Sequence, residues 1–312
     1  MATWFNRMAI LAGLLVLGNG AGARTLEVGE GKAYKLPSLA AAAAHDGDVV
    51  RIFPGEYFDC ATWAANKLVV EGVGDAASVV ITDKACGGKA LFITTSPDVT
   101  IRNLTLTRAR VPDMNGAGIR GEGALLTVEG VRFINNQNGI LSGFPDGTII
   151  VRDSVFDRNG TCEGKCSHGI YVGNSKLLRV EHSQFSDTKQ GHHIKSRAVR
   201  TEVIGNTIKD GPEGTASYLI DIPNGGSVVI RDNDMEKGPR AENRSTAISI
   251  GAEGVTQPTR EIVVANNVFR NAGSYDTVFV SNFTATEAVL QGNKLSGRVV
   301  PLKGDGKVIP AS

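Results

Sequence analysis

One short segment holds four titratable side chains within six positions. In the run GHHIKSRA, residues 191–198, they are His192, His193, Lys195 and Arg197. A surface strand that needs only solubility seldom concentrates so many groups that can carry or transfer a proton, and such clusters often mark functional sites. The segment is therefore the first candidate for a catalytic or binding site.

These residue types suit proton abstraction next to the carboxylate of an acidic sugar. The carboxylate must first be neutralised, because the intermediate carries additional negative charge. Arg197 can pair with a carboxylate through two hydrogen bonds. Lys195 is the candidate general base, and Tyr171 or His193 the acid or alternative base. Asp221 would orient Lys195 or hold a cation.

The same residues allow a structural interpretation. Lys195 and Asp221 could form an ion pair on a solvated face, which would contribute little to stability. His168 and His192 share the parity of the buried isoleucines in their strands, so they could be core or turn histidines. We take the catalytic interpretation as the hypothesis and retain the structural one beside it.

The candidate residues are placed by a recurring strand with a central isoleucine. The isoleucines are Ile140, Ile170, Ile194, Ile220 and Ile248, 24 to 30 residues apart. If they point inward, alternation sends their neighbours outward. The following residues are Leu141, Tyr171, Lys195, Asp221 and Ser249, and the preceding ones are Gly139, Gly169, His193, Leu219 and Ala247. With strands stacked in parallel about 4.8 Å apart, Tyr171, Lys195 and Asp221 form one row. His193 and Arg197 are predicted on the same face.

Two loops flank the strand of Asp221. Residues 212–215 lead into it and residues 223–226 leave it. Turn chemistry explains their glycines and prolines without a function. Glu213 and Asn224 are nevertheless predicted to lie beside the row and contact substrate.

The strand belongs to a longer repeat. Eight pairs of apolar residues, five positions apart, return every 23 to 34 residues: Ile101/Leu106, Val128/Phe133, Val151/Phe156, Val180/Phe185, Val203/Ile208, Ile230/Met235, Val264/Phe269 and Leu290/Leu295. This period and composition predict a solenoid whose coils each add short strands. Asn206, Asn233, Asn267 and Asn293 occupy one equivalent position, which favours an asparagine ladder over four unrelated turn residues.

The ends of the chain carry separate signals. Residues 1–23 match a secretory signal, with Arg7, an apolar core at residues 8–17 and the small-residue site Ala-Gly-Ala at 21–23. The apolar core is too short to span a bilayer, so a secreted or periplasmic protein without a membrane span is predicted. An alanine-rich helix at residues 36–45 is expected to cap the first coil at 38–45. Residues 24–297 form one predicted domain, and residues 298–312 a loose tail.

Charge and cysteine content narrow the class of protein further. The 312-residue chain has a formal net charge of +1, which does not indicate nucleic-acid binding. Its four cysteines, an even number, favour disulfides in an exported protein. Cys60–Cys86, about one coil apart, is the favoured pair, which leaves Cys162–Cys166 to close a short loop. A zinc site is disfavoured because no second ligand pair has suitable spacing.

Three segments resemble a known family. AAAAHDGDVVRIFPGEYFD at 41–59, LVVEGVG at 68–74 and VVITD at 79–83 are similar to the first coils of right-handed parallel β-helix proteins of the pectate-lyase-like superfold. The resemblance covers roughly residues 25–297 and implies an all-β, single-domain solenoid with a short N-terminal capping helix. That superfold includes polysaccharide lyases, pectin-type hydrolases and esterases, uronate epimerases and phage tailspikes, so it does not fix the reaction. Its calcium-dependent lyases hold the metal with clustered acids. Here Asp221 is the main candidate, so calcium has weak support and no cofactor is predicted.

The remaining motifs favour a lyase. Pectin-type hydrolases need clustered acids in register, and none is found on the predicted face. An Asp-Pro-His-Asp run, typical of uronate epimerases, is absent. The sequence therefore predicts an exported protein that acts on a uronate-containing polysaccharide by β-elimination. The alternative is a non-catalytic β-helix that binds glycan or packs in the cell envelope. No oligomeric state is predicted.

Overall fold

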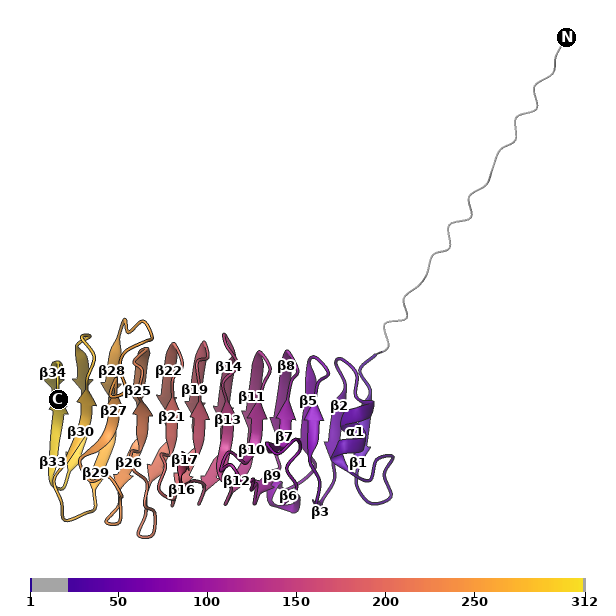
Figure 1. Cartoon of the computed structure of the whole chain (residues 1–312), viewed down its shortest axis with the longest axis horizontal. Coiled ribbons are helices and arrows are strands. Elements are labelled where there is room, and N and C mark those ends of the chain that lie inside the picture. The colour runs from indigo at the N-terminus through magenta and orange to yellow at the C-terminus, as the bar shows by residue number, and fades with distance from the viewer. Residues whose placement is uncertain (2–21, 311–312) are drawn as a thin grey trace.

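The computed structural model describes residue 1 and residues 22–310, and shows an elongated solenoid of stacked coils (Figure 1). The predicted secretory signal lies almost wholly outside the described residues. The chain winds repeatedly through three parallel sheets, here named A, B and C, as the predicted right-handed parallel β-helix requires. The predicted fold class is confirmed.

Sheet A has twelve strands: β1 (Thr25–Val28), β2 (Val49–Ile52), β5 (Leu68–Gly72), β8 (Asp98–Arg102), β11 (Leu125–Glu129), β14 (Thr148–Arg152), β19 (Leu177–Glu181), β22 (Arg200–Ile204), β25 (Ser227–Arg231), β28 (Ile262–Ala265), β31 (Ala288–Gln291) and β34 (Gly306–Ile309). Sheet B has ten: β3 (Gly55–Tyr57), β6 (Val79–Thr82), β9 (Thr105–Thr107), β12 (Arg132–Ile134), β15 (Val155–Asp157), β20 (Gln184–Ser186), β23 (Thr207–Lys209), β26 (Asp234–Lys237), β29 (Val268–Asn271) and β32 (Lys294–Ser296).

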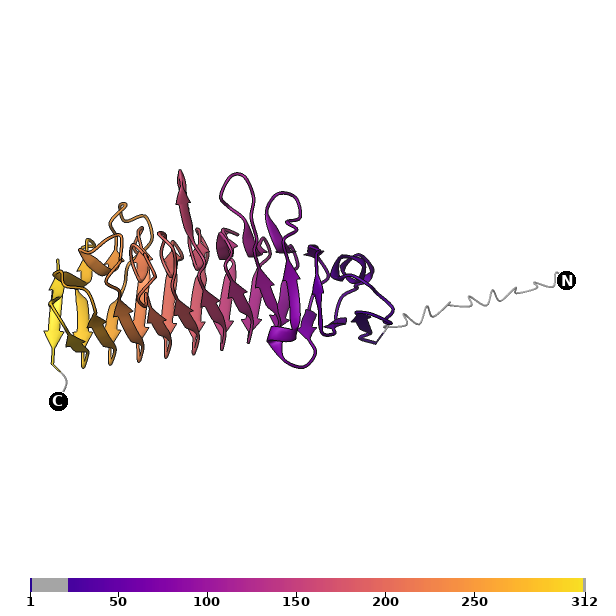
Figure 2. The ribbon, with the colours of Figure 1, turned by 90° about the horizontal axis from the view of Figure 1, so that it is seen from below.

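Sheet C also has ten strands: β4 (Ala61–Trp63), β7 (Ala90–Thr94), β10 (Ala117–Gly121), β13 (Asn138–Ser142), β18 (Ile170–Val172), β21 (Ile194–Ser196), β24 (Ile220–Ile222), β27 (Thr246–Ile250), β30 (Thr277–Asn282) and β33 (Val299–Lys303). A separate antiparallel hairpin, β16 (Thr161–Glu163) and β17 (Lys165–Ser167), projects with longer loops along one edge (Figure 2).

The core is a narrow column filled by equivalent residues of successive coils. The eight predicted apolar pairs span the turn from sheet A to sheet B, and all their members except Leu295 are buried. Within this column the rings of Phe133, Phe156 and Phe185 stack at centroid separations of 4.6 Å. Because each coil is thin, a buried side chain packs mainly against its equivalents above and below.

The turn from sheet A to sheet B repeats one backbone conformation. Its first residue has a positive φ in eight coils: Asn103, Gly130, Asp153, His182, Gly205, Asp232, Asn266 and Gly292. Asparagine, aspartate and glycine tolerate this left-handed region well, which explains most of the column. The next residue along the chain is the position that the ladder asparagines occupy in the last four of these coils.

The predicted asparagine ladder is present. Asn206 Nδ2 donates to Asn233 Oδ1 at 3.0 Å, Asn233 Nδ2 to Asn267 Oδ1 at 2.9 Å, and Asn267 Nδ2 to Asn293 Oδ1 at 2.9 Å. Asn233 Nδ2 also donates to the carbonyl oxygen of Val203, so its amide satisfies buried backbone. The ladder thus adds side-chain hydrogen bonds to the backbone hydrogen bonds that join neighbouring coils at this turn.

Both ends of the solenoid differ in detail from expectation. Helix α1 runs from Pro37 to Ala43 and packs against β1 and β4 at the first coil, which confirms the capping helix (Figure 1). A 3-10 turn, η1 (Ala76–Ser78), precedes β6. The loose tail predicted from residue 298 is wrong, because β33 and β34 pair with β30 and β31 and continue the sheets to Ile309. Gly304, at φ +97°, allows the tight turn between them.

Both predicted disulfides are present. Cys60 and Cys86 are joined with their Cα atoms 5.4 Å apart, next to sheet C in neighbouring coils. Cys162 and Cys166 are joined across the β16–β17 hairpin. Within residues 22–310 we find no helix with the length and apolarity needed to cross a membrane.

The ladder yields a stability prediction. Asn233→Ala should lower the free energy of unfolding by about 2–4 kcal/mol, because it leaves the Val203 carbonyl and the Asn206 backbone N–H without partners in a buried turn. Asn293→Ala, at the half-buried last rung, should cost less because water can replace the amide. Urea unfolding of both variants measures the difference. Equal losses would contradict a ladder whose interior rungs depend on dry partners.

Candidate active site

The predicted row of Tyr171, Lys195 and Asp221 is present on sheet C. Tyr171 in β18 pairs in register with Lys195 in β21, which pairs with Asp221 in β24. The inward isoleucines of the same strands, Ile170, Ile194 and Ile220, are fully buried. Alternation about them therefore turns the three polar side chains to the outer face.

Lys195 is held between two carboxylates. Its Nζ lies 3.2 Å from Asp221 Oδ2 and 3.0 Å from Glu253 Oε1. The Lys195 side chain is only 11% exposed, so the ion pair with Asp221 is not the solvated surface pair of the structural interpretation. Removing either partner of such a pair leaves a largely buried charge.

Arg197 connects the row to two loops. Its Nε donates to the Tyr171 hydroxyl at 3.0 Å, and its Nη2 lies 2.6 Å from Glu253 Oε2. Its Nη1 donates to Asn224 Oδ1, so the turn after β24 lies beside the row. The other predicted loop residue, Glu213, is exposed and pairs with Arg240 at 2.6 Å instead, so the structure does not bring it into this cluster.

His193 does not lie on the outer face, contrary to the prediction. It is fully buried, with Nδ1 2.7 Å from Thr188 Oγ1 and Nε2 2.8 Å from Asp210 Oδ1. Its neighbours Thr188 and Asp210 are equally inaccessible. This hydrogen-bonded chain fixes the turn between β20 and β21 and cannot reach a polymer, so His193 is not an acid or base for substrate.

The error has a backbone cause. The residue before each central isoleucine also points inward, which breaks the alternation. Leu219 and Ala247 of this column belong to the core, and a Cβ added at Gly118 or Gly139 would meet the rings of Phe133 or Phe156. Because two consecutive residues point inward, the alternation of inward and outward side chains is shifted by one residue in the segment before them. The residue two places before the isoleucine therefore faces outward.

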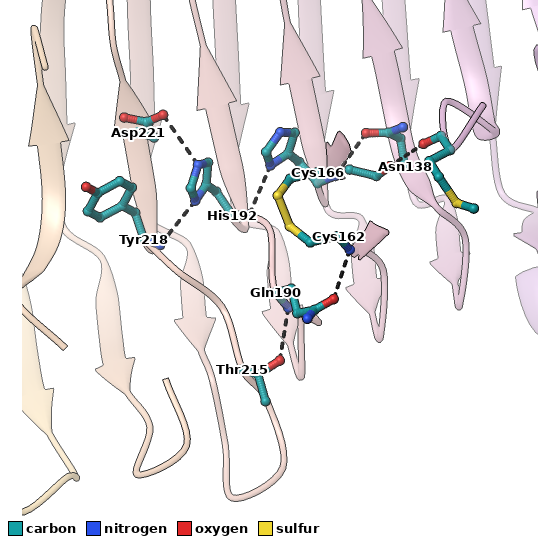
Figure 3. The surroundings of a disulfide bond; sticks show 11 residues. Asn138, Cys162, Cys166, Gln190, His192, Thr215, Tyr218 and Asp221 are labelled. Atoms are coloured by element: carbon teal, nitrogen blue, oxygen red, sulfur yellow. Dashed lines mark hydrogen bonds and ion pairs between the residues drawn. A yellow bond between two sulfur atoms is a disulfide. The ribbon is translucent and has the colours of Figure 1, made fainter. Parts of the chain in front are cut away.

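That reversal brings His168, His192 and Tyr218 to the outer face. Figure 3 shows His192 and Tyr218 beside Asp221 of the row. The rings of His168 and His192 stack at 4.7 Å, and Tyr218 lies 5.1 Å from His192. His168 also contacts Tyr171 edge to face at 5.2 Å. Sequence reasoning placed His168 and His192 with the core and did not single out Tyr218. All three stand two residues before a central isoleucine, which was the available signal.

These side chains form a second ladder, in which a side chain of one coil accepts a hydrogen bond from the backbone N–H of the next coil. Asn138 Oδ1 accepts the His168 backbone N–H at 2.9 Å, His168 Nδ1 that of His192 at 3.0 Å, and His192 Nδ1 that of Tyr218 at 3.1 Å. Each imidazole accepts at Nδ1 and so carries its proton at Nε2. His192 Nε2 lies 3.4 Å from Asp221 Oδ2 and is directed to it (Figure 3).

Burial keeps both imidazoles neutral. Burial, reinforced by the positive charges of Lys195 and Arg197, lowers the pKa of His168 from 6.5 to about 3. Burial and the neighbouring His168 and Lys195 hold the pKa of His192 well below 6.5. Since the lone pair at Nδ1 is already used in each ring, neither histidine is free to accept a substrate proton. They position Tyr171 and Asp221 instead.

The two carboxylates of the site differ in environment. Burial raises the pKa of Asp221, against the opposing effect of Lys195. Partial burial acts in the same direction on Glu253, but the hydrogen bonds from Arg197 and Lys195 outweigh it and lower the pKa of Glu253. Glu253 was missed by sequence reasoning, since it lies on the loop after β27, 58 positions from Lys195.

The described residues do not fit the weakly supported calcium site. No group of three or more His, Cys, Asp or Glu side chains among them has a metal-binding arrangement. Asp221, the main candidate ligand, is already bound by the Lys195 ammonium, and calcium sites need several oxygen ligands. No step of the chemistry is therefore derived through calcium.

Comparison with known proteins identifies the family to which the chain belongs. It matches the family described as "Right handed beta helix region" over residues 68–208 and 161–304, and so belongs to that family. No curated protein matches it at a significant level. Among solved structures, an alginate lyase from Paenibacillus sp. str. FPU-7 is similar at 19% identity and a TM-score of 0.58, covering 91% of this chain and 99% of that one.

Two further solved structures are more distant. The A-module of a mannuronan C-5 epimerase from Azotobacter vinelandii is 17% identical with a TM-score of 0.40, covering 87% of this chain and 91% of that one. A pectin methylesterase from Erwinia chrysanthemi is 10% identical with a TM-score of 0.40, covering 89% and 93%. At these identities the comparisons establish the fold, and the reaction must be argued from the site.

His168 predicts a pH dependence of stability. Unfolded His168 binds a proton below its ordinary pKa of 6.5, whereas the folded residue does not until about pH 3. Stability should therefore fall as the pH drops through this window, by about 2 kcal/mol between pH 6.5 and 4.5 from this residue. His168→Asn should reduce that slope, leaving the part that His192 contributes, while keeping an acceptor for the His192 N–H, as Asn138 does one coil earlier.

Urea unfolding at several pH values measures the slope. His182→Asn is the matched control, because His182 is exposed and its left-handed turn position holds asparagine in other coils. Its slope should match that of the unaltered protein. An unchanged slope in His168→Asn would show that the buried imidazole does not carry the effect.

Proposed function

We propose that this protein is an exported lyase that cleaves a uronate-containing polysaccharide by β-elimination on the outer face of sheet C. One observation carries the proposal: Lys195 and Arg197 together bind a single carboxylate, that of Glu253, beside the Tyr171 hydroxyl. Two cations converging on one carboxylate form the arrangement that neutralises a uronate group. A phenol next to them can exchange a proton with a sugar.

The elimination makes specific demands on the site. The C5 proton of the uronate is removed, its electron pair forms the C4–C5 double bond, and the C4–O bond to the neighbouring sugar breaks. The departing oxygen takes up a proton. Because charge flows into the carboxylate as C5 loses its proton, a cation must already be paired with that carboxylate. Arg197 is assigned this role.

Tyr171 is assigned to the departing oxygen. Its hydroxyl accepts a hydrogen bond from Arg197 Nε at 3.0 Å, which leaves its own O–H free to be donated. Its ring is held at the edge of His168, so the hydroxyl has a defined position. Proton donation by such a positioned group typically contributes about 10²–10⁴-fold to the rate.

Lys195 is assigned as the base that removes the C5 proton. His192 and His168 are excluded by their occupied Nδ1 atoms, and His193 by its burial. To act as the base Lys195 must be the neutral amine, so the mechanism requires its Nζ to lose a proton after Glu253 has left. Departure of Glu253 leaves the buried Asp221 to orient Nζ, while Arg197 is assigned to hold the uronate carboxylate.

The comparisons support the class of reaction without fixing the polymer. The alginate lyase that shares this fold acts on an acidic polysaccharide by the chemistry its name gives. Export is part of the proposal, supported by the signal-like residues 1–23 and the two disulfides.

An absorbance screen tests the activity. A lyase creates a C=C bond conjugated to the carboxylate, so near-ultraviolet absorbance should rise with alginate, pectate or glucuronan. Binding to a polymer with no rise on any of them would instead support the non-catalytic glycan-binding alternative.

Two substitutions test the assignment of roles. Lys195→Arg keeps a cation beside Asp221 but removes the base, and Tyr171→Phe keeps the ring but removes the acid. Each should lower kcat by about 10²–10⁴-fold. Arginine is preferred to alanine because loss of the ammonium would leave Asp221 buried and unpaired. Lys303→Arg, in the same outward row but exposed, is the matched control and should retain full activity. Full activity in Lys195→Arg would transfer the base to another residue.

A further inference from the structure

We propose that the Glu253 carboxylate occupies the place of the substrate's uronate carboxylate, so that the free protein is inhibited by its own side chain until a uronate displaces it. The inference rests on the proposed function and deepens it, because it locates the subsite for the charged group. It also adds Glu253 as a residue that sets the apparent affinity for substrate.

The contacts of Glu253 are those expected of a bound uronate. Its two oxygens are divided between the cations, with Oε1 3.0 Å from Lys195 Nζ and Oε2 2.6 Å from Arg197 Nη2. A carboxylate that bridges two cations in this way satisfies both with one negative charge. The Lys195 and Arg197 side chains are 11% and 21% exposed, whereas that of Glu253 is 47% exposed. The cations are thus built into the sheet, and the anion lies over them from the solvent side.

The backbone that carries Glu253 is anchored. The Gly251 N–H donates to the Ile222 carbonyl at 2.8 Å, that of Glu253 to Pro223 at 2.9 Å, and that of Gln257 to Asn224 at 3.0 Å. These bonds tie the loop to the turn after β24. Displacement therefore needs only rotation of a half-exposed side chain toward solvent, and the loop itself stays in place.

Glu253 can occupy the subsite without preventing substrate binding, because binding exchanges one carboxylate for another. A uronate restores the ion pair with Arg197 and returns one negative charge to the site, so the exchange is nearly balanced in charge. A neutral sugar that displaced Glu253 would leave two largely buried cations facing the single anion Asp221, which is unfavourable.

The test compares Glu253→Gln with Glu261→Gln. Glutamine removes the charge and with it the competition. Glu261 is the matched control on the same loop, 45% exposed and paired with Arg200 at 2.6 Å, away from the row. If Glu253 blocks the subsite about nine-tenths of the time, its removal should lower KM about tenfold. kcat should not fall, and Glu261→Gln should leave both constants unchanged. Glu253→Ala, which removes the side chain altogether, should have at least as large an effect as glutamine.

Binding is measured separately from turnover. In a Tyr171→Phe background, which retains both cations, calorimetric titration with short oligomers of alginate, pectate and glucuronan should show about tenfold tighter binding of one of them after Glu253→Gln. This result supports the inference even if no polymer is cleaved and the lyase proposal fails. Cleavage with unchanged KM and unchanged binding would overturn the inference alone.

Two other outcomes also contradict it. A lower kcat together with weaker binding would show that Glu253 positions Lys195 or the substrate and does not compete with it. Failure of every oligomer to bind either form would remove both the subsite and the lyase proposal.

Discussion

Each coil is hydrogen-bonded in register to the next, so every residue lies directly beside its equivalents in the neighbouring coils. This stacking makes each outward column a line of side chains about 4.8 Å apart, where like charges repel and opposite charges pair. Sheet A shows the consequence in a column that alternates in sign over seven coils: Glu27, Arg51, Glu71, Arg102, Glu129, Arg152 and Glu181. These partly exposed pairs contribute little individually, but they keep the register free of repulsion. The outward column of sheet C instead collects Tyr171, Lys195 and Asp221, where the charges are largely buried and chemically available.

Because register alone fixes such columns, much of the site could be predicted from sequence. The spacing of the central isoleucines was enough to align Tyr171, Lys195 and Asp221, and the repeat of asparagines was enough to predict the ladder. The histidines could not be placed in the same way, because alternation holds only while the strand is regular. The residues immediately before the isoleucines also point inward, which requires a bend in the strand. As a result His192 faces outward and His193 faces inward. A pattern of side-chain types carries no direct sign of that bend, although the glycines at 118, 139 and 169 occupy the column in three successive coils.

Loops are a second limit on prediction from register. Glu253 belongs to the longest interval of the repeat, and nothing in the periodicity indicates where an inserted loop will fold. The structure shows that it folds back over the previous coil, where the turn at Pro223 and Asn224 supplies its backbone partners. Glu213 was predicted from the same kind of argument and lies elsewhere, because it precedes β24 whereas Asn224 follows it, so the two residues lie at opposite ends of the strand. Adjacency to the strand in sequence therefore does not decide whether a loop residue reaches the row.

The charge balance of the site links its stability to its chemistry. In the free protein two cations, Lys195 and Arg197, face two anions, Asp221 and Glu253, so the cluster is neutral and its buried members are paired. Only Glu253 is both an anion and half-exposed, and it is the one member that can leave without exposing the core. A neutral ligand would disturb this balance, whereas a uronate preserves it. The same pairing that makes a buried lysine tolerable in the fold therefore also favours an acidic polymer as the ligand that replaces Glu253.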